Sequence, residues 1–246
     1  MQRYPRHVRT LVVCVLVPLA AAWPLTAVGA PGPGPVRGPT PTLSWTARVL
    51  IPVEARVAPR RTARRVLVLQ PTAPLAGGPT ALLVTGTVRT HGGGSWVRLL
   101  LPVRPNGTQG WVPASTLRFV STRLRLLIDQ GDRRLTLFRR GRQVMSVPVA
   151  VGAPSTPTPT GRFAVAEMIR TRTPGAFLGP VVFPLTGFSE TLNEYAGGNG
   201  RFAVHGTSVP QFLGTRASHG CVRVGNSEIV RLSRLVRPGT PVTIRW

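Results

Sequence analysis

The sequence is short of three residue types, and these shortages limit the kinds of site it can hold. Only two cysteines, Cys14 and Cys221, occur in 246 residues; lysine does not occur, and there are seven acidic residues. Cys221 and the two histidines nearest to it, His205 and His219, supply at most three ligands, and no carboxylate lies close to them in sequence. We therefore expect no metal site. A Ser-His-Asp triad is disfavoured as well, since acidic residues are scarce and no G-x-S-x-G motif occurs in the region around Cys221. We expect no cofactor.

Long helices are also not expected, because residues that interrupt them are abundant. The chain contains 26 prolines and 27 glycines, which favour turns and β-structure. Its length leaves room for a leader and either one large or two small domains. We therefore predict a mainly β protein with one or two short helices.

The first 30 residues predict export. A basic start is followed by the apolar run LVVCVLVPLAAAW and by the small residues AVGA. This order is typical of a secretory signal that is cleaved after Ala30. The apolar run also approaches the ~20 residues that span a bilayer, so a retained signal anchor is the alternative. In either case we expect an exported protein, secreted or anchored outside the cytoplasm.

Export changes the interpretation of Cys221. Cys14 lies within the predicted signal, so Cys221 has no cysteine with which to form an internal disulfide. Exported proteins usually pair their cysteines or avoid them. A single thiol in an oxidising compartment is therefore either buried and inert or used in catalysis.

Three further segments follow the predicted signal. Residues 31–44 form a Pro/Gly linker, and residues 45–120 contain short apolar runs separated by turn residues, which predicts a small barrel or sandwich. The stretch GSWVRLLLPVRPNGTQGWVPASTL resembles bacterial SH3-like domains, which implies a wall-binding or spacer module. Trp96 and Trp111 would then be core residues or ligand-stacking residues of its groove.

Residues 121–246 are predicted to form a second β domain. The runs RLRLLIDQ, RRLTLFRR and QVMSVPVAVG are separated by the turns Gly131-Asp132 and Gly141-Arg142, which predicts two hairpins. A later strand, RFAVHG, ends at His205. The segment NSEIVRLSRLV is the clearest helix, and we expect Asn226 to cap it.

The residues near Cys221 supply what a nucleophilic thiol needs. A thiol is activated by a nearby base or positive charge. Both His205 and His219 are available as the base, and spacing alone does not choose between them. Glycines adjoin both Cys221 and His205, and they allow close backbone approach, so that backbone N–H groups could face a developing oxyanion. Arg223, two residues after Cys221, either points to the thiol side and binds a substrate carboxylate or is an ordinary surface arginine.

The whole run FAVHGTSVPQFLGTRASHGCVRVGNSEIVRL closely resembles the YkuD-type L,D-transpeptidase family. The family signature is a His-Gly pair, a loop, and then S/T-H-G-C followed by an apolar residue and Arg or Asn. Supporting matches are PVAVGAPSTPTPTGRF before this run and RPGTPVTI after it. The resemblance spans residues 123–246 and implies a β-sandwich with the cysteine loop over one sheet.

The resemblance also implies the role of each site residue. Cys221 would be the nucleophile, His205 the general base, and the Gly206 carbonyl the group that orients His205. His219 would shape the loop and support the oxyanion site. The residues that would position the substrate are Ser218, Gly220 and Arg223.

The implied activity is cross-linking of peptidoglycan stem peptides in the 3–3 mode, through a cysteine thioester and with release of D-Ala. Hydrolysis at the same site, or wall binding without catalysis, are the alternatives. The net charge of +24 fits an anionic environment, and anionic wall polymers suit an exported protein. We expect no nucleic-acid partner, since only charge favours one. Carbapenems acylate many members of the family, which makes them candidate ligands.

Overall fold

The structure is a computed structural model that describes residues 38–91, 93–194 and 198–246. These residues belong to one compact unit. The predicted signal and the first half of the predicted linker lie outside the described residues. Within the described part of the chain, no helix is long and apolar enough to cross a membrane.

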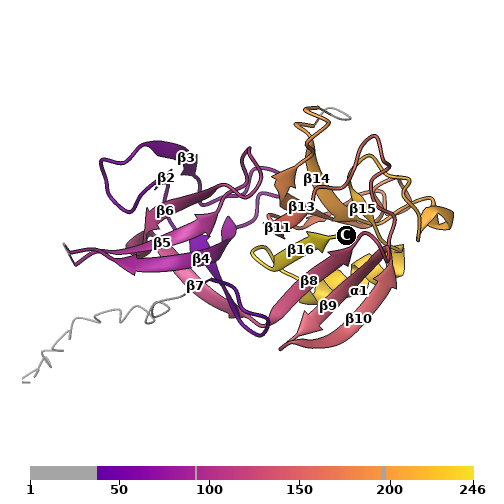
Figure 1. The fold of residues 1–246 in the computed structure, drawn as a ribbon, viewed down its shortest axis with the longest axis horizontal. Coiled ribbons are helices and arrows are strands. Elements are labelled where there is room, and N and C mark those ends of the chain that lie inside the picture. The colour runs from indigo at the N-terminus through magenta and orange to yellow at the C-terminus, as the bar shows by residue number, and fades with distance from the viewer. Residues whose placement is uncertain (1–37, 92, 195–197) are drawn as a thin grey trace, which may run out of the picture. The chain divides into compact units, whose positions relative to one another are not determined.

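Residues 44–122, here called the N-terminal module, form a seven-stranded sheet with the order β3-β2-β6-β5-β4-β1-β7 (Figure 1). Its strands are β1 (Ser44–Val49), β2 (Val53–Arg56), β3 (Arg65–Leu69), β4 (Ala81–Arg89), β5 (Ser95–Leu100), β6 (Gln109–Pro113) and β7 (Leu117–Thr122). All these pairings are antiparallel. The predicted series of short strands is thereby confirmed. Trp96 is buried, whereas Trp111 is half-buried, with the Arg98 guanidinium 5.4 Å from its ring centroid.

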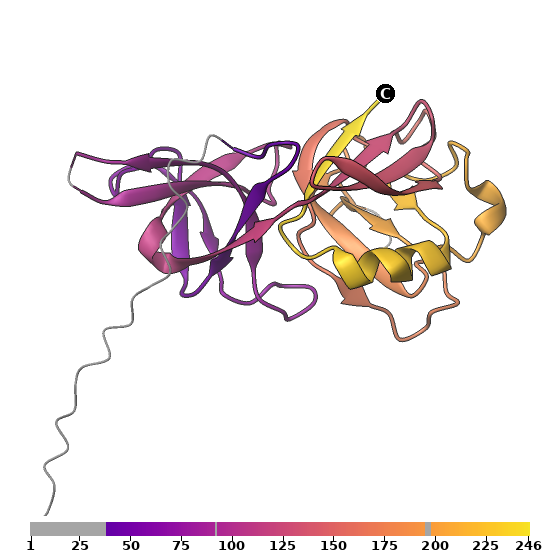
Figure 2. The ribbon, with the colours of Figure 1, turned by 90° about the horizontal axis from the view of Figure 1, so that it is seen from below.

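Residues 124–245 contain two further sheets (Figures 1 and 2). The five-stranded sheet has the order β10-β9-β8-β16-β11, and the four-stranded sheet has the order β12-β13-β14-β15. Their strands are β8 (Leu124–Asp129), β9 (Arg134–Arg139), β10 (Arg142–Pro148), β11 (Gly161–Ala164), β12 (Ile169–Arg170), β13 (Val181–Phe188), β14 (Arg201–His205), β15 (Val222–Arg223) and β16 (Pro241–Arg245). The antiparallel pairs β8–β9 and β9–β10 are the two predicted hairpins. The described chain is therefore mainly β, as predicted.

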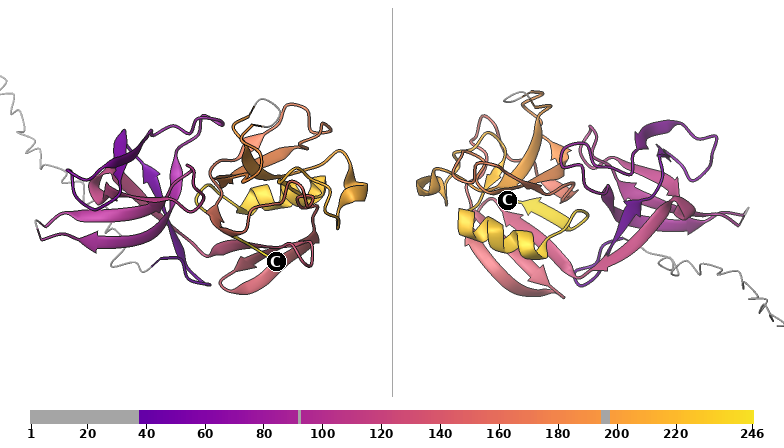
Figure 3. Two further views of the ribbon diagram at one scale, coloured as in Figure 1. Left: turned by 45° about the horizontal axis from the view of Figure 1, so that its top comes forward. Right: turned by 180° about the vertical axis from the view of Figure 1, so that it is seen from behind.

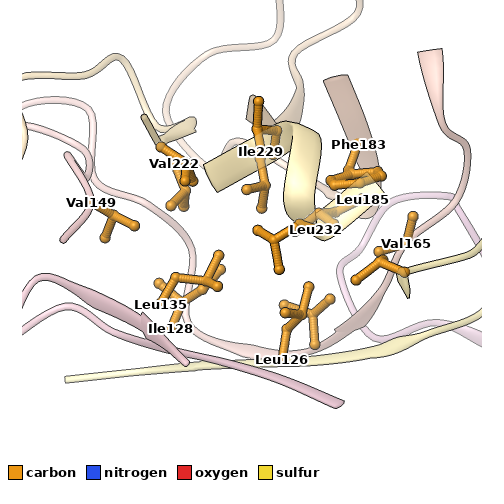
Figure 4. Close-up of a cluster of buried hydrophobic side chains, with 14 of the residues drawn as sticks. Leu126, Ile128, Leu135, Val149, Val165, Phe183, Leu185, Val222, Ile229 and Leu232 are labelled. Carbon is orange, nitrogen blue, oxygen red and sulfur yellow. The ribbon is translucent and has the colours of Figure 1, made fainter. Parts of the chain in front are cut away.

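The single α-helix of the described residues, α1 (Asn226–Leu235), packs on the core of this second part (Figure 3). Ile229 and Leu232 are fully buried and point from the helix toward Leu126, Ile128 and Leu135 of β8 and β9 (Figure 4). The described part of the chain also contains two single-turn 3-10 segments, Ala114–Thr116 and Pro210–Phe212.

The predicted cap of α1 is wrong. Gly225 occupies the N-cap position and provides no side-chain cap, while Asn226 is the first helical residue. The Asn226 Oδ1 atom accepts a hydrogen bond from the Thr207 backbone N–H at 2.9 Å. The Asn226 side chain therefore makes a tertiary hydrogen bond to Thr207 instead of capping α1.

Leu232→Ala is expected to lower the free energy of unfolding by ~2–5 kcal/mol, because it removes a fully buried side chain and leaves a cavity in the core. Urea unfolding followed by circular dichroism measures the change. Leu235→Ala, on the same helix but only partly buried, is the matched control and should cost clearly less. Equal losses from both variants would contradict this account of the helix packing.

Candidate active site

Strand pairing brings Cys221 and His205 together. Cys221 directly precedes β15, and β15 runs parallel to β14, with Val204 opposite Val222 and His205 opposite Arg223. This register sets Cys221 level with Ala203, whose backbone hydrogen-bonds the thiol. His205 and Cys221 both line one cavity of about 360 Å³. The two residues that the sequence placed sixteen positions apart therefore share one site.

The loop before Cys221 is held by Ser218 and Gly220. The buried Ser218 hydroxyl donates to the Cys221 carbonyl at 2.5 Å and accepts from the Gly220 N–H at 3.2 Å. Gly220 has a φ of +106°, a conformation that a residue with a Cβ would adopt only under strain. In this structure the Ser218 hydroxyl is thus occupied within the loop.

His205 is buried and held in one orientation. Its Nδ1 atom lies 2.6 Å from the Gly206 carbonyl oxygen. Because a carbonyl oxygen only accepts, Nδ1 must carry the proton, and Nε2 is then the basic nitrogen. Burial lowers the pKa of His205 from 6.5 to about 4; the hydrogen bond at Gly206 opposes this, and the positive charge of Arg223 adds to it. The imidazole is therefore neutral at neutral pH and able to accept a proton.

The thiol of Cys221 is neutral as well. Burial raises its pKa, although a hydrogen bond from the Ala203 backbone and the charge of Arg223 act in the opposite direction. The free site therefore contains a neutral thiol and a neutral imidazole rather than an ion pair. Proton transfer between them must accompany attack on a substrate.

Arg223 is a buried cation at the same cavity. It is 6% exposed, and its guanidinium carbon lies 4.8 Å from the ring centroid of Phe177. Its Nε atom is buried without a hydrogen-bond partner among the described residues. A buried guanidinium with an unused donor is suited to bind a carboxylate that enters the cavity. The structure thus places Arg223 in the site and not on the surface.

His219 is exposed and lines the cavity. His91, by contrast, lies in an exposed turn after β4 and does not line it. Several cavity residues carried no motif in the sequence and were not predicted, among them Phe177, Leu178 and Arg201. Leu75 of the N-terminal module also lines the cavity.

The burial of His205 predicts acid sensitivity of the fold. The unfolded chain binds a proton at this residue near its ordinary value of 6.5, whereas the folded protein binds it only near pH 4. The unfolded state therefore takes up more protons in this window. The free energy of unfolding should decrease by ~3 kcal/mol as the pH falls from 6.5 to 4, and this contribution is fully present above pH 6.5.

Urea unfolding at a series of pH values measures this decrease. His205→Asn should remove the part of the slope that belongs to His205, whereas the exposed His219→Asn should keep it. An unchanged slope in His205→Asn would show that another group causes the acid sensitivity.

Comparisons with known proteins match the part of the chain that contains this site. Residues 123–244 match the family model of the L,D-transpeptidase catalytic domain, YkuD. The putative L,D-transpeptidase YkuD of Bacillus subtilis is 32% identical over 119 residues, which is 48% of this chain and 64% of that protein. The probable L,D-transpeptidase YbiS of Escherichia coli is 31% identical over 132 residues, which is 48% of this chain and 43% of that protein. The chain thus spans less than two-thirds of each of these relatives.

Solved structures show a weaker likeness. L,D-transpeptidase 3 from Mycobacterium tuberculosis has a TM-score of 0.43 and 14% identity, covering 66% of this chain and 98% of that one. A Bdellovibrio bacteriovorus structure has a TM-score of 0.41 and 26% identity, covering 50% of this chain and 48% of that one. The family assignment rests on the sequence match. Residues 123–244 of this chain, which contain the Cys221 site, are thus similar in sequence to the L,D-transpeptidase catalytic domain of the YkuD family.

Proposed function

We propose that the protein is a peptidoglycan L,D-transpeptidase that forms 3–3 cross-links through a thioester on Cys221. The observation that carries the proposal is the buried His205, fixed by the Gly206 carbonyl and sharing a cavity with Cys221. A nucleophile and a base held by a third group are parts that acyl transfer requires, and the buried cation Arg223 is suited to bind a substrate carboxylate.

The first step forms the acyl-enzyme. Sγ of Cys221 attacks the carbonyl carbon between the third residue of the stem peptide and its terminal D-Ala, while Nε2 of His205 takes the thiol proton. We assign the oxyanion to the Cys221 backbone N–H, because the Gly220 N–H is already bound to Ser218. The C–N bond then breaks, the proton passes from His205 to the leaving amine, and D-Ala departs.

The second step transfers the acyl group. An amine of a neighbouring stem attacks the thioester carbonyl and gives a proton to Nε2 of His205. The C–S bond breaks and the thiol recovers that proton. If water attacks in place of the amine, the thioester is hydrolysed. The first step, acylation of Cys221, is therefore the same for a transpeptidase and for a carboxypeptidase.

The remaining partners also belong to this proposal. We infer that the chain is exported to the cell wall and that its charge of +24 associates with anionic wall polymers. Residues 45–120 would be an SH3-like wall-binding or spacer domain. One similar structure is an L,D-transpeptidase in complex with imipenem and another is an avibactam carbamoyl enzyme. By extension, a carbapenem would acylate Cys221 here.

Mass spectrometry of purified residues 31–246, incubated with disaccharide-tetrapeptide, tests the proposal. A dimer that has lost one D-Ala is the expected product, and Cys221→Ala should not make it. Tripeptide alone would identify a hydrolase. Absence of any product from folded protein would favour a wall-binding protein without catalysis.

A further inference from the structure

One loop of the N-terminal module reaches the cavity of Cys221. Leu75, between β3 and β4, lines this cavity together with Cys221 and His205. Its side chain is 57% exposed, so it is not part of the module's own core. An exposed leucine at the wall of an active-site cavity is available to contact a substrate.

A buried carboxylate holds this loop in place. Glu167, only 3% exposed, accepts hydrogen bonds through Oε2 from the Leu75 N–H at 3.0 Å and the Ala76 N–H at 2.6 Å. Its Oε1 atom lies 3.8 Å from Nη1 of Arg201, which also lines the cavity. One buried side chain thus links the Leu75 loop to the catalytic domain, and hydrogen bonds to a buried charge are among the stronger ones.

A second set of contacts ties the module to the connection between β13 and β14. The Arg104 guanidinium donates to the carbonyls of Ser189, Leu192 and Asn199 at 3.3, 3.2 and 3.0 Å. Asn106 exchanges two hydrogen bonds of 2.8 Å with the backbone of Phe188. Ser189, Leu192 and Asn199 all line the cavity, so the module supports this wall as well.

These contacts lie at the end of the cavity that is remote from the reacting atoms. Arg201, Ala203 and His205 alternate along β14 and line the cavity on one face. Four strand residues span ~13 Å, so the backbone of Arg201 lies about that far along β14 from His205, and the Arg201 side chain meets Glu167 at 3.8 Å. An extended peptide covers this distance with three or four residues.

We propose that the N-terminal module forms the remote end of the acyl-donor cleft, with Leu75 in contact with the far end of the stem peptide, about three residues from the scissile bond. Glu167 is the positioning residue that holds Leu75 there. This inference deepens the proposed transpeptidase function and rests on it for the identity of the donor. It makes the module a part of the substrate site, in addition to any binding to the wall.

Steady-state release of D-Ala by residues 31–246 tests the inference, with two donors. For disaccharide-tetrapeptide, Leu75→Ala should raise KM about five-fold and leave kcat unchanged, because it removes apolar contact area away from the reacting atoms. For an acetylated dipeptide ending in D-Ala, which is too short to reach Leu75, the variant should equal the wild type. Leu50→Ala changes a similarly exposed leucine of the same module that does not line this cavity, and it is the matched control.

Glu167→Gln tests the positioning role. It should raise KM for the long donor as Leu75→Ala does, and the double variant should be no worse than the poorer single variant, since both act through one contact. Amide exchange at Leu75 and Ala76 should become faster in Glu167→Gln. Additive KM increases in the double variant, or unchanged amide exchange at Leu75 and Ala76, would overturn the role of Glu167. A loss of thermal stability alone would affect the long and the short donor equally.

A binding measurement separates this inference from the proposed function. Binding of disaccharide-tetrapeptide to Cys221→Ala can be measured without turnover. Adding Leu75→Ala to this variant should lower the affinity about five-fold. Lack of D-Ala release by the wild type, with this binding difference present, would reject the transpeptidase and keep the cleft. Equal affinities in Leu75→Ala and Leu50→Ala, absence of binding, or an equal effect on the short donor would overturn the inference.

Discussion

Replacing Cys221 by alanine is expected to lower the release of D-Ala from disaccharide-tetrapeptide by at least ~10⁴-fold, because no other side chain at the cavity can form the thioester. Among the described residues Cys221 is the only cysteine. Intact-protein mass spectrometry should detect an acyl adduct on the wild type and none on the variant. The same measurement with a carbapenem should give the same contrast.

The variant must be compared as a folded protein. Cys221 is only partly buried and packs at the edge of the core, so Cys221→Ala should change the melting temperature little. Cys221→Ser replaces the thiol by a hydroxyl and should also be inactive, since a hydroxyl gives up its proton to an imidazole far less readily than a thiol does. Substantial D-Ala release by either variant would place the nucleophile elsewhere.

The loss of His205 should have the second-largest effect. His205→Ala removes the proton acceptor, and general-base catalysis typically contributes 10²–10⁴-fold, so we expect kcat to fall by ~10³-fold. His219→Ala should reduce kcat only about ten-fold, because His219 is an exposed residue of the cavity wall. Single-turnover acylation by a carbapenem measures this step without the acceptor amine.

The two histidines are controls for one another. If His219→Ala caused the large loss and His205→Ala none, the base would be His219. A large loss from His205→Ala with unchanged circular dichroism and an intact thiol, titrated in denaturant, would instead support His205.

Local patterns predicted the elements that depend on local interactions. The hairpins of β8, β9 and β10 follow from alternating apolar residues and from glycine turns at residues 131 and 141. The helix α1 was predicted from its apolar stripe, and Ile229 and Leu232 of this stripe are buried. The cap at Asn226 failed because Thr207, nineteen residues earlier, offers its N–H to the same side chain.

The site was only partly predictable for the same reason. The motif predicted which residues react, but spacing did not choose between His205 and His219. The family resemblance implied His205, and the burial of His205 and its 2.6 Å contact with Gly206 fit that prediction. Glu167 and Leu75 carry no motif and meet across 92 positions, so no pattern of neighbours along the chain indicates their contact.

The parallel pairing of β14 with β15 also bears on how this protein can change during evolution. His205 ends β14 and Cys221 directly precedes β15, the neighbouring hydrogen-bonded strand, so a shift of one against the other would require the ladder to break. The walls around them come partly from β13 and β14 and partly from loops, including the Leu75 loop of the N-terminal module, and the loops are not held by such a ladder. Mutations can therefore alter which donor is accepted while the chemistry persists, and laboratory recombination of N-terminal modules is a route to new donor preferences.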